Sequence, residues 1–242
     1  MLTSLLQGTQ SFSEIIIHIL MRIPAVLIAI SVHEAAHGYA SYKLGDPTAK
    51  LMGRVTINPL KHFDLFGVIC MLLVGFGWAK PVPFDVRCLK HPKRDTAIIA
   101  AAGPVSNFLI AVLFTVIYCV LYVIALLNNF MLLAEGIYPI LLEMIQIIVL
   151  MNLSLMIFNF LPIPPLDGSK IVISFLPYSA YKFVLTMEKY GMSILMIWLL
   201  ISDRLPNFIS ITYWISWLVI RIYDFITLGC FDIIGLILNL FV

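Results

Sequence analysis

Charged side chains are scarce in this sequence. Only 12% of its 242 residues are Asp, Glu, Lys or Arg, whereas a soluble domain has roughly 25%. Hydrophobic residues make up 62% of the chain. This balance excludes a soluble globular domain and predicts an integral membrane protein.

Paired cysteines and a removable leader are also missing. The four cysteines are scattered and form no C-x-x-C spacing, so we interpret them as small apolar residues and not as disulfides or metal ligands. The first residues contain no basic n-region followed by a small-residue cleavage site. A removed signal peptide is therefore not expected.

Long apolar runs dominate what is present. A membrane-crossing helix needs about 20 apolar residues, and five segments reach or approach this length: 14–43, 97–127, 138–160, 190–203 and 206–229. The run 65–77 is shorter and would span only about 20 Å as a helix, less than the roughly 30 Å of a bilayer core. Because basic residues flank it on both sides, we expect it to enter the membrane and return. The alternative is a sixth crossing.

The basic residues predict the orientation. Nine of the fifteen Lys and Arg residues lie between Lys43 and Arg94, and the connection 128–137 has none. The positive-inside rule therefore places 43–94 on the cytoplasmic side and both the N-terminus and 128–137 outside. A net charge of +2 carries little further information, and no nucleic-acid partner is expected.

Two short segments predict extended structure. Residues 50–58 alternate polar and apolar from Arg54 onward, which favours a short strand. Residues 80–86 contain Pro81 and Pro83, which oppose a helix. We therefore expect an all-α polytopic membrane protein with five to six transmembrane helices, a re-entrant segment and a small membrane-associated β element.

The motif H-E-x-x-H stands inside the first apolar run, as His33, Glu34 and His37. Two His side chains four residues apart share one helix face and can bind one Zn²⁺, and the adjacent Glu is placed to act as a general base. Three ionisable residues in a membrane helix are costly, so they call for a functional explanation.

A catalytic zinc site usually has three protein ligands, and the sequence leaves the third open. Asp46 lies in a Gly-Asp-Pro sequence that is more simply a turn. Asp64 could merely cap a helix. Asp167 follows three prolines that break an apolar helix, and irregular backbone in a membrane is tolerated where it lines a cavity. The alternative for Asp167 is an N-cap of the next helix.

These motifs together resemble the site-2 proteases, a family of intramembrane zinc metalloproteases. The resemblance rests on H-E-x-x-H followed by N-x-x-P-x-P-x-L-D-G, which runs from Asn159 to Gly168. The stretches 101–107 and 77–83 add support. Together these motifs cover about residues 25–175. Neither a PDZ insertion nor a CBS tail is present, so the chain resembles a compact member.

The resemblance implies a role for each motif residue. It implies that Asp167 is the third zinc ligand beside His33 and His37, with one Zn²⁺ per chain, and that Glu34 is the general base and acid. It also suggests that Asn107 and Asn159 face the substrate or the developing oxyanion. For both Asn residues, a helix–helix hydrogen bond is the alternative.

A substrate contact is also expected at the extended segment. Both prolines remove donors from one edge, which leaves the N–H groups of Val82 and Phe84 on the other. We hypothesise that Val82 and Phe84 pair with an unwound substrate segment. The alternative is that the prolines only stiffen a loop.

The sequence therefore predicts an intramembrane zinc endopeptidase that cleaves membrane-spanning proteins, with the lipid bilayer as its environment. We expect one domain, 1–242, with a catalytic core at about 14–176 and C-terminal helices at about 177–242. A prokaryotic plasma membrane, with the active site toward the cytoplasm, fits so compact a chain. The rivals are a zinc peptidase acting on extramembrane peptides, and a zinc transporter or inactive scaffold. The oligomeric state and the substrate are not indicated.

Overall fold

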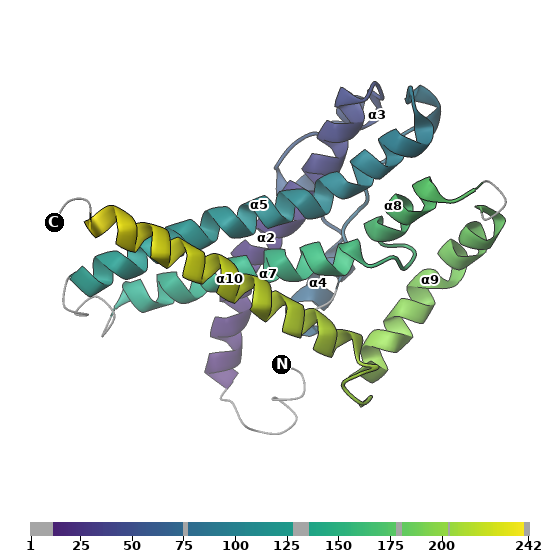
Figure 1. The fold of residues 1–242 in the computed structure, drawn as a ribbon. Coiled ribbons are helices and arrows are strands. Elements are labelled where there is room, and N and C mark those ends of the chain that lie inside the picture. Colours follow the sequence, from purple (N-terminus) through teal and green to yellow (C-terminus); the bar gives the residue numbers. More distant parts are fainter. Residues whose placement is uncertain (1–11, 75–76, 128–135, 178–180, 203, 240–242) are drawn as a thin grey trace.

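The computed structural model describes residues 12–74, 77–127, 136–177, 181–202 and 204–239 (Figure 1). Every regular element in these residues is a helix, which confirms the all-α class. In chain order the elements are α2 (Phe12–Lys43), α3 (Thr48–Leu51), η1 (Pro59–Lys61), α4 (Leu65–Val74), η2 (Val86–Cys88), α5 (Pro92–Leu127), α7 (Ile137–Phe160), α8 (Asp167–Phe175), α9 (Tyr181–Ser202) and α10 (Ile211–Asn239).

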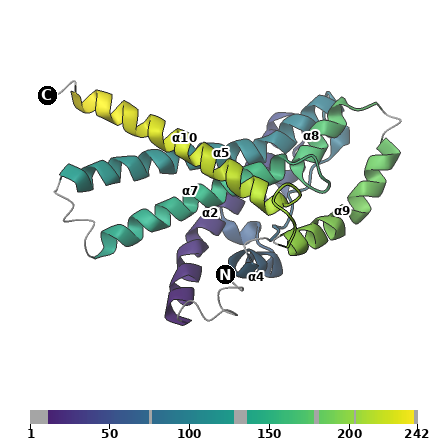
Figure 2. The ribbon, with the colours of Figure 1, turned by 60° about the horizontal axis from the view of Figure 1, so that its bottom comes forward.

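Helices α2, α5 and α7 pack on one another, and α10 lies along α5 and α7 (Figures 1 and 2). Small residues permit this close packing, because Ala25 and Ala29 of α2 are fully buried. Ala111, Leu153 and Val219 join α5, α7 and α10 in one apolar cluster. This packing holds the ends of α5 and α7 against the middle of α2.

Three helices are long and apolar enough to cross a membrane: α2 from Ile16, α5 and α7. They correspond to the expected crossings 14–43, 97–127 and 138–160. The expected segments 190–203 and 206–229 fall largely on α9 and α10. Both are helical, but they are not among the candidate spans found in the described residues. Five or six crossings are therefore not established.

The expected β element is absent from the described part of the chain. Residues 50–58 contain the end of α3 and a turn, and η1 follows at once. Gly53 has φ +65°, and the Arg54 N–H donates to the Ala49 carbonyl, so the chain curls back where a strand would extend. Residues 80–85 lie outside any helix or strand. The alternation after Arg54 is too short to outweigh this local turn.

Helix α4 contains 10 residues, which span about 15 Å. The chain on either side of it meets again, because the Lys80 N–H donates to the His62 carbonyl at 2.9 Å. The returning chain also lies against the first turn of α4, since a Cβ on Gly67 would come within 1.9 Å of the Trp78 carbonyl oxygen. The entry of 65–77 into the membrane and its return stay a prediction, and residues 75–76 lie outside the described residues.

Cysteine labelling tests which side of the membrane carries the two ends of this loop. In a background without native cysteines, single cysteines at Lys61 and Lys90 should react with an impermeant reagent from the same, cytoplasmic side. Both positions are exposed. A full crossing would put His62 and Lys80 on opposite sides of the membrane, whereas the structure joins them by a hydrogen bond. Labelling from opposite sides would contradict re-entry.

Candidate active site

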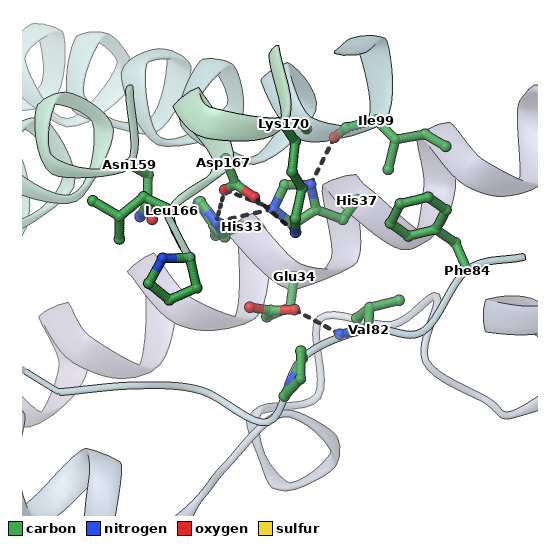
Figure 3. A pocket seen from close by; sticks show the side chains of 13 residues that line it. His33, Glu34, His37, Val82, Phe84, Ile99, Asn159, Leu166, Asp167 and Lys170 are labelled. Atoms are coloured by element: carbon green, nitrogen blue, oxygen red, sulfur yellow. Dashed lines mark hydrogen bonds and ion pairs between the residues drawn. The ribbon is translucent and has the colours of Figure 1, made fainter. Parts of the chain in front are cut away.

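His33 and His37 project from one face of α2 toward the start of α8 (Figure 3). Their Nε2 atoms lie 3.0 Å apart, and each is 3.1 Å from Oδ2 of Asp167. His33 and Asp167 are buried, with 5% and 7% of their surface exposed. The structure thus joins residues that are 134 positions apart in the chain.

The outer nitrogens of both imidazoles face oxygen atoms. His33 Nδ1 lies 3.0 Å from Oδ1 of Asn107, and His37 Nδ1 lies 2.7 Å from the Ile99 carbonyl oxygen. These oxygens only accept hydrogen bonds, so each Nδ1 carries the proton and donates it. Each Nε2 then presents a lone pair toward the other and toward the carboxylate of Asp167.

Three electron-pair donors that face one another at this distance repel unless a cation lies between them. Two imidazole nitrogens and one carboxylate oxygen are a donor set that suits Zn²⁺, and the hydrogen bonds at Nδ1 orient the rings for it. His33, His37 and Asp167 form the one cluster of potential metal ligands in the described residues. The site fits the zinc ion expected from the sequence.

Gly103 of α5 leaves the space for the two imidazoles. A Cβ on Gly103 would lie 2.4 Å from Nε2 of His37 and 2.6 Å from Cε1 of His33. Such approaches are far inside van der Waals contact. The small residue is therefore needed because α5 passes directly beneath the rings.

Replacing Gly103 with alanine should remove most of the zinc from the purified protein and destabilise it by about 1–3 kcal/mol, the usual cost of overpacking. Zinc content per chain and thermal unfolding measure both effects. Gly229→Ala is a matched control, since a Cβ at Gly229 on α10 meets nothing within 4 Å. Normal zinc content in Gly103→Ala would show that the imidazoles can move aside at little cost.

The break between α7 and α8 places Asp167. Helix α7 ends at Phe160, and the chain runs irregularly through Leu166 before α8 begins at Asp167. Gly168 allows a tight return, because a Cβ there would lie 2.3 Å from the Phe160 carbonyl oxygen. Leu166 occupies the N-cap position and makes no side-chain capping bond. Asp167 is therefore not the N-cap that the sequence left as its alternative.

Glu34 lies beside the histidines and faces a cavity of about 160 Å³. Its Oε2 accepts a hydrogen bond from the main-chain N–H of Val82 at 3.1 Å (Figure 3). The proposed substrate residues Val82, Phe84 and Asn159 also line this cavity. The N–H of Val82 is engaged by Glu34 in this structure and is not an open donor.

Asn107 does not line this cavity. It is fully buried on α5, behind His33. Lys170 was not expected from the sequence, yet it lines the cavity, with Nζ 3.6 Å from Oδ1 of Asp167. The i, i+3 spacing from Asp167 could have predicted it once α8 was recognised as a helix.

The two alternative third ligands lie elsewhere. The Asp64 carboxylate accepts the Gly67 N–H at 2.9 Å and so caps the start of α4. Asp46 accepts from Ser41 and Thr48 near the end of α2, and from the Asp85 N–H at 2.7 Å. Burial raises the pKa of Asp46, but these hydrogen bonds outweigh it and hold the pKa below its usual value. Asp46 therefore stays ionised at neutral pH as a structural acceptor.

Comparison with known proteins matches residues 21–202 to the model of peptidase family M50. YwhC of Bacillus subtilis strain 168, a zinc metalloprotease by name, is 37% identical over 174 residues, which cover 71% of this chain and 76% of YwhC. Rip2 of Mycolicibacterium smegmatis, named in the same way, is 25% identical over 193 residues, covering 78% of this chain and 70% of Rip2. Rip2 of Mycobacterium tuberculosis strain H37Rv is 23% identical over 200 residues, covering 81% and 72%. No solved structure matches the chain.

Proposed function

The chain belongs to peptidase family M50, and on this basis we propose that it hydrolyses peptide bonds in or near the membrane-spanning helices of other proteins. It is a zinc metalloprotease. The observation that carries the proposal is the convergence of His33, His37 and Asp167 beside the Glu34 carboxylate, with both histidines on a helix long and apolar enough to cross a membrane. A transporter is not favoured, because the described ligand residues gather at one site.

His33, His37 and Asp167 would hold the zinc ion. When bound, zinc supplies a Lewis acid that polarises the scissile carbonyl and activates a water molecule. The Asn107 amide and the Ile99 carbonyl keep both imidazoles in the tautomer that offers Nε2. These two hydrogen bonds hold both Nε2 atoms toward Oδ2 of Asp167.

Glu34 would move the protons of the reaction. Its carboxylate accepts a proton from the attacking water and then delivers it to the leaving amine. Two facts support this role: Glu34 lines the cavity that the ligand residues also line, and it follows His33 directly on α2. Its Oε2 accepts the Val82 N–H at 3.1 Å, and Oε1 would carry the proton.

The substrate would lie between the extended segment and the α7–α8 connection. Val82 and Phe84 line one part of the cavity, and Asn159 and Leu166 line another. The Nδ2 of Asn159 donates to the Leu155 carbonyl at 3.1 Å, and its amide group can still turn toward a developing oxyanion. Asn107 would act on the substrate only through His33. Pairing of substrate with Val82 requires that Glu34 release the Val82 N–H.

We further propose that chain 1–242 is one membrane domain in a prokaryotic plasma membrane, with the site nearer its cytoplasmic side. The clustering of basic residues between Lys43 and Arg94 supports this orientation. A substrate helix buries its carbonyls in its own hydrogen bonds, so it must unwind locally before it can be cleaved.

The test is to incubate the purified, zinc-loaded protein in lipid vesicles with a panel of single-pass membrane proteins. Mass spectrometry of the products should locate a cut within or beside a membrane-spanning segment of at least one substrate. Removal of zinc with a chelator should abolish the cut. Cleavage confined to soluble peptides would favour the rival peptidase that acts outside the membrane.

A further inference from the structure

The segment Lys80–Asp85 is bound to the rest of the protein along its main chain. The Lys80 N–H donates to the His62 carbonyl at 2.9 Å, and the Asp85 N–H donates to the Asp46 carboxylate at 2.7 Å. Between these anchors, the Val82 N–H donates to Oε2 of Glu34 at 3.1 Å. The segment therefore passes beside the catalytic helix with both ends fixed.

Pro81 and Pro83 leave one main-chain donor between them. Proline has no N–H and holds its own φ near −65°. Val82 is consequently the only residue from 81 to 83 that can donate a main-chain hydrogen bond, and its donor is held by a stiff backbone. A stiff backbone reduces the conformational freedom that must be lost when the hydrogen bond forms.

The side chain of Val82 also holds the segment beside α2. Val82 is 9% exposed. A Cβ on Gly38 of α2 would lie 3.4 Å from Cγ1 of Val82, so the Val82 side chain lies beside the position where Gly38 has no side chain. Gly38 lies four residues after Glu34, one turn along the same helix. The side chain of Val82 therefore lies beside α2 near Gly38, and its amide donates to Glu34.

We propose that Pro81-Val82-Pro83 is a positioning element for the general base, in which the Val82 N–H holds one oxygen of the Glu34 carboxylate and leaves Oε1 for proton transfer. This inference rests on the proposed role of Glu34. A hydrogen bond from an amide to a carboxylate is strong and directional, so it restricts a side chain that otherwise rotates about three bonds. Val82 is then a positioning residue and not a catalytic one.

Hydrogen exchange tests the contact without any catalysis. Because the flanking residues are prolines, the Val82 amide is the only exchangeable main-chain hydrogen between Lys80 and Phe84, so mass spectrometry of a fragment can isolate it. Glu34→Ala should speed its exchange by about tenfold or more, since the acceptor is lost. Glu34→Gln retains an acceptor oxygen and should keep most of the protection.

The Asp85 amide, which Asp46 holds, is the internal reference and should exchange at an unchanged rate in both variants. Faster exchange at Val82 alone supports the proposal. Equal protection of Val82 in the wild-type protein and in Glu34→Ala would overturn it, whether or not any substrate is ever cleaved. This outcome is therefore distinct from a failure of the proposed protease function.

Kinetics separate positioning from substrate binding. Val82→Pro deletes the donor and should lower kcat by about 10- to 100-fold, the range expected when a reacting group is misplaced. KM and zinc content should stay near the wild-type values. Val82→Ala keeps the N–H but loses side-chain packing beside Gly38, so its kcat should fall less than that of Val82→Pro. Protection of the Asp85 amide verifies that the segment remains docked in both variants.

The opposite pattern assigns Val82 to the substrate. A Val82→Pro variant with raised KM and unchanged kcat would overturn the positioning role and favour pairing between the extended segment and an unwound substrate. An unchanged kcat together with an unchanged KM would overturn both roles.

Discussion

Asp167→Ala should strip the purified protein of its zinc. The wild-type protein should contain about one Zn²⁺ per chain, held by three protein ligands. Without Asp167, the Nε2 atoms of His33 and His37, which lie 3.0 Å apart, lose the anionic member of the ligand set. Two neutral ligands would then have to bind a divalent cation at a buried position, which is unfavourable. Elemental analysis of the purified protein gives the metal content directly.

Asp64→Ala is the control for this experiment. Asp64 was the alternative third ligand, and the structure uses it to cap α4, so the variant should retain its zinc. His37→Ala should lose zinc as Asp167→Ala does. Full zinc retention in Asp167→Ala would show that this residue is not a zinc ligand. Zinc loss in Asp64→Ala would favour Asp64, at the start of α4, as the third ligand.

Glu34→Gln should keep zinc and lose proteolysis. Glutamine occupies nearly the same volume and still offers the Val82 N–H an oxygen, so the geometry of the site should persist. It cannot take a proton from water at neutral pH, and loss of a general base costs about 10²- to 10⁴-fold in rate. Initial rates on a membrane protein substrate, together with zinc content, give both quantities.

Glu143→Gln provides the comparison for loss of a carboxylate elsewhere in the membrane helices. Glu143 of α7 lies near His18, at 3.8 Å, and is half exposed. It should leave the cleavage rate within about twofold of the wild type, as surface changes away from special features usually do. If Glu34→Gln cleaves as fast as the wild type, Glu34 is not the base and another group must accept the proton.

The residues that meet in the candidate metal cluster could be predicted because their signal is local. His33, Glu34 and His37 stand within five residues of one helix, and Asp167 is marked by the prolines before it. The apolar runs likewise predicted helices at α2, α5 and α7. In each case the motif or the apolar run lies in neighbouring residues, so it can be recognised without knowledge of the tertiary structure.

One error has a local cause, and the other differences depend on contacts between distant residues. The strand expected at 50–58 fails because Gly53 turns the chain after α3. Asn107 faces His33 and not the cavity, which depends on how α5 is rotated against α2. The engagement of the Val82 N–H joins residues 48 positions apart. The pattern of prolines around Val82 predicted a special donor, but it could not identify the partner.

The size of the cavity at the metal site sets a condition on catalysis. Its volume is about 160 Å³, enough for several water molecules, each of which needs about 10–15 Å³ of such space. It is smaller than the roughly 300–1,000 Å³ of pockets that enclose small ligands. A polypeptide segment that needs more room than this enters only when the walls move apart. The free energy of that opening then adds to the overall barrier for turnover. Each 1.4 kcal/mol that favours the closed form slows cleavage about tenfold, even if the chemical step is unaltered.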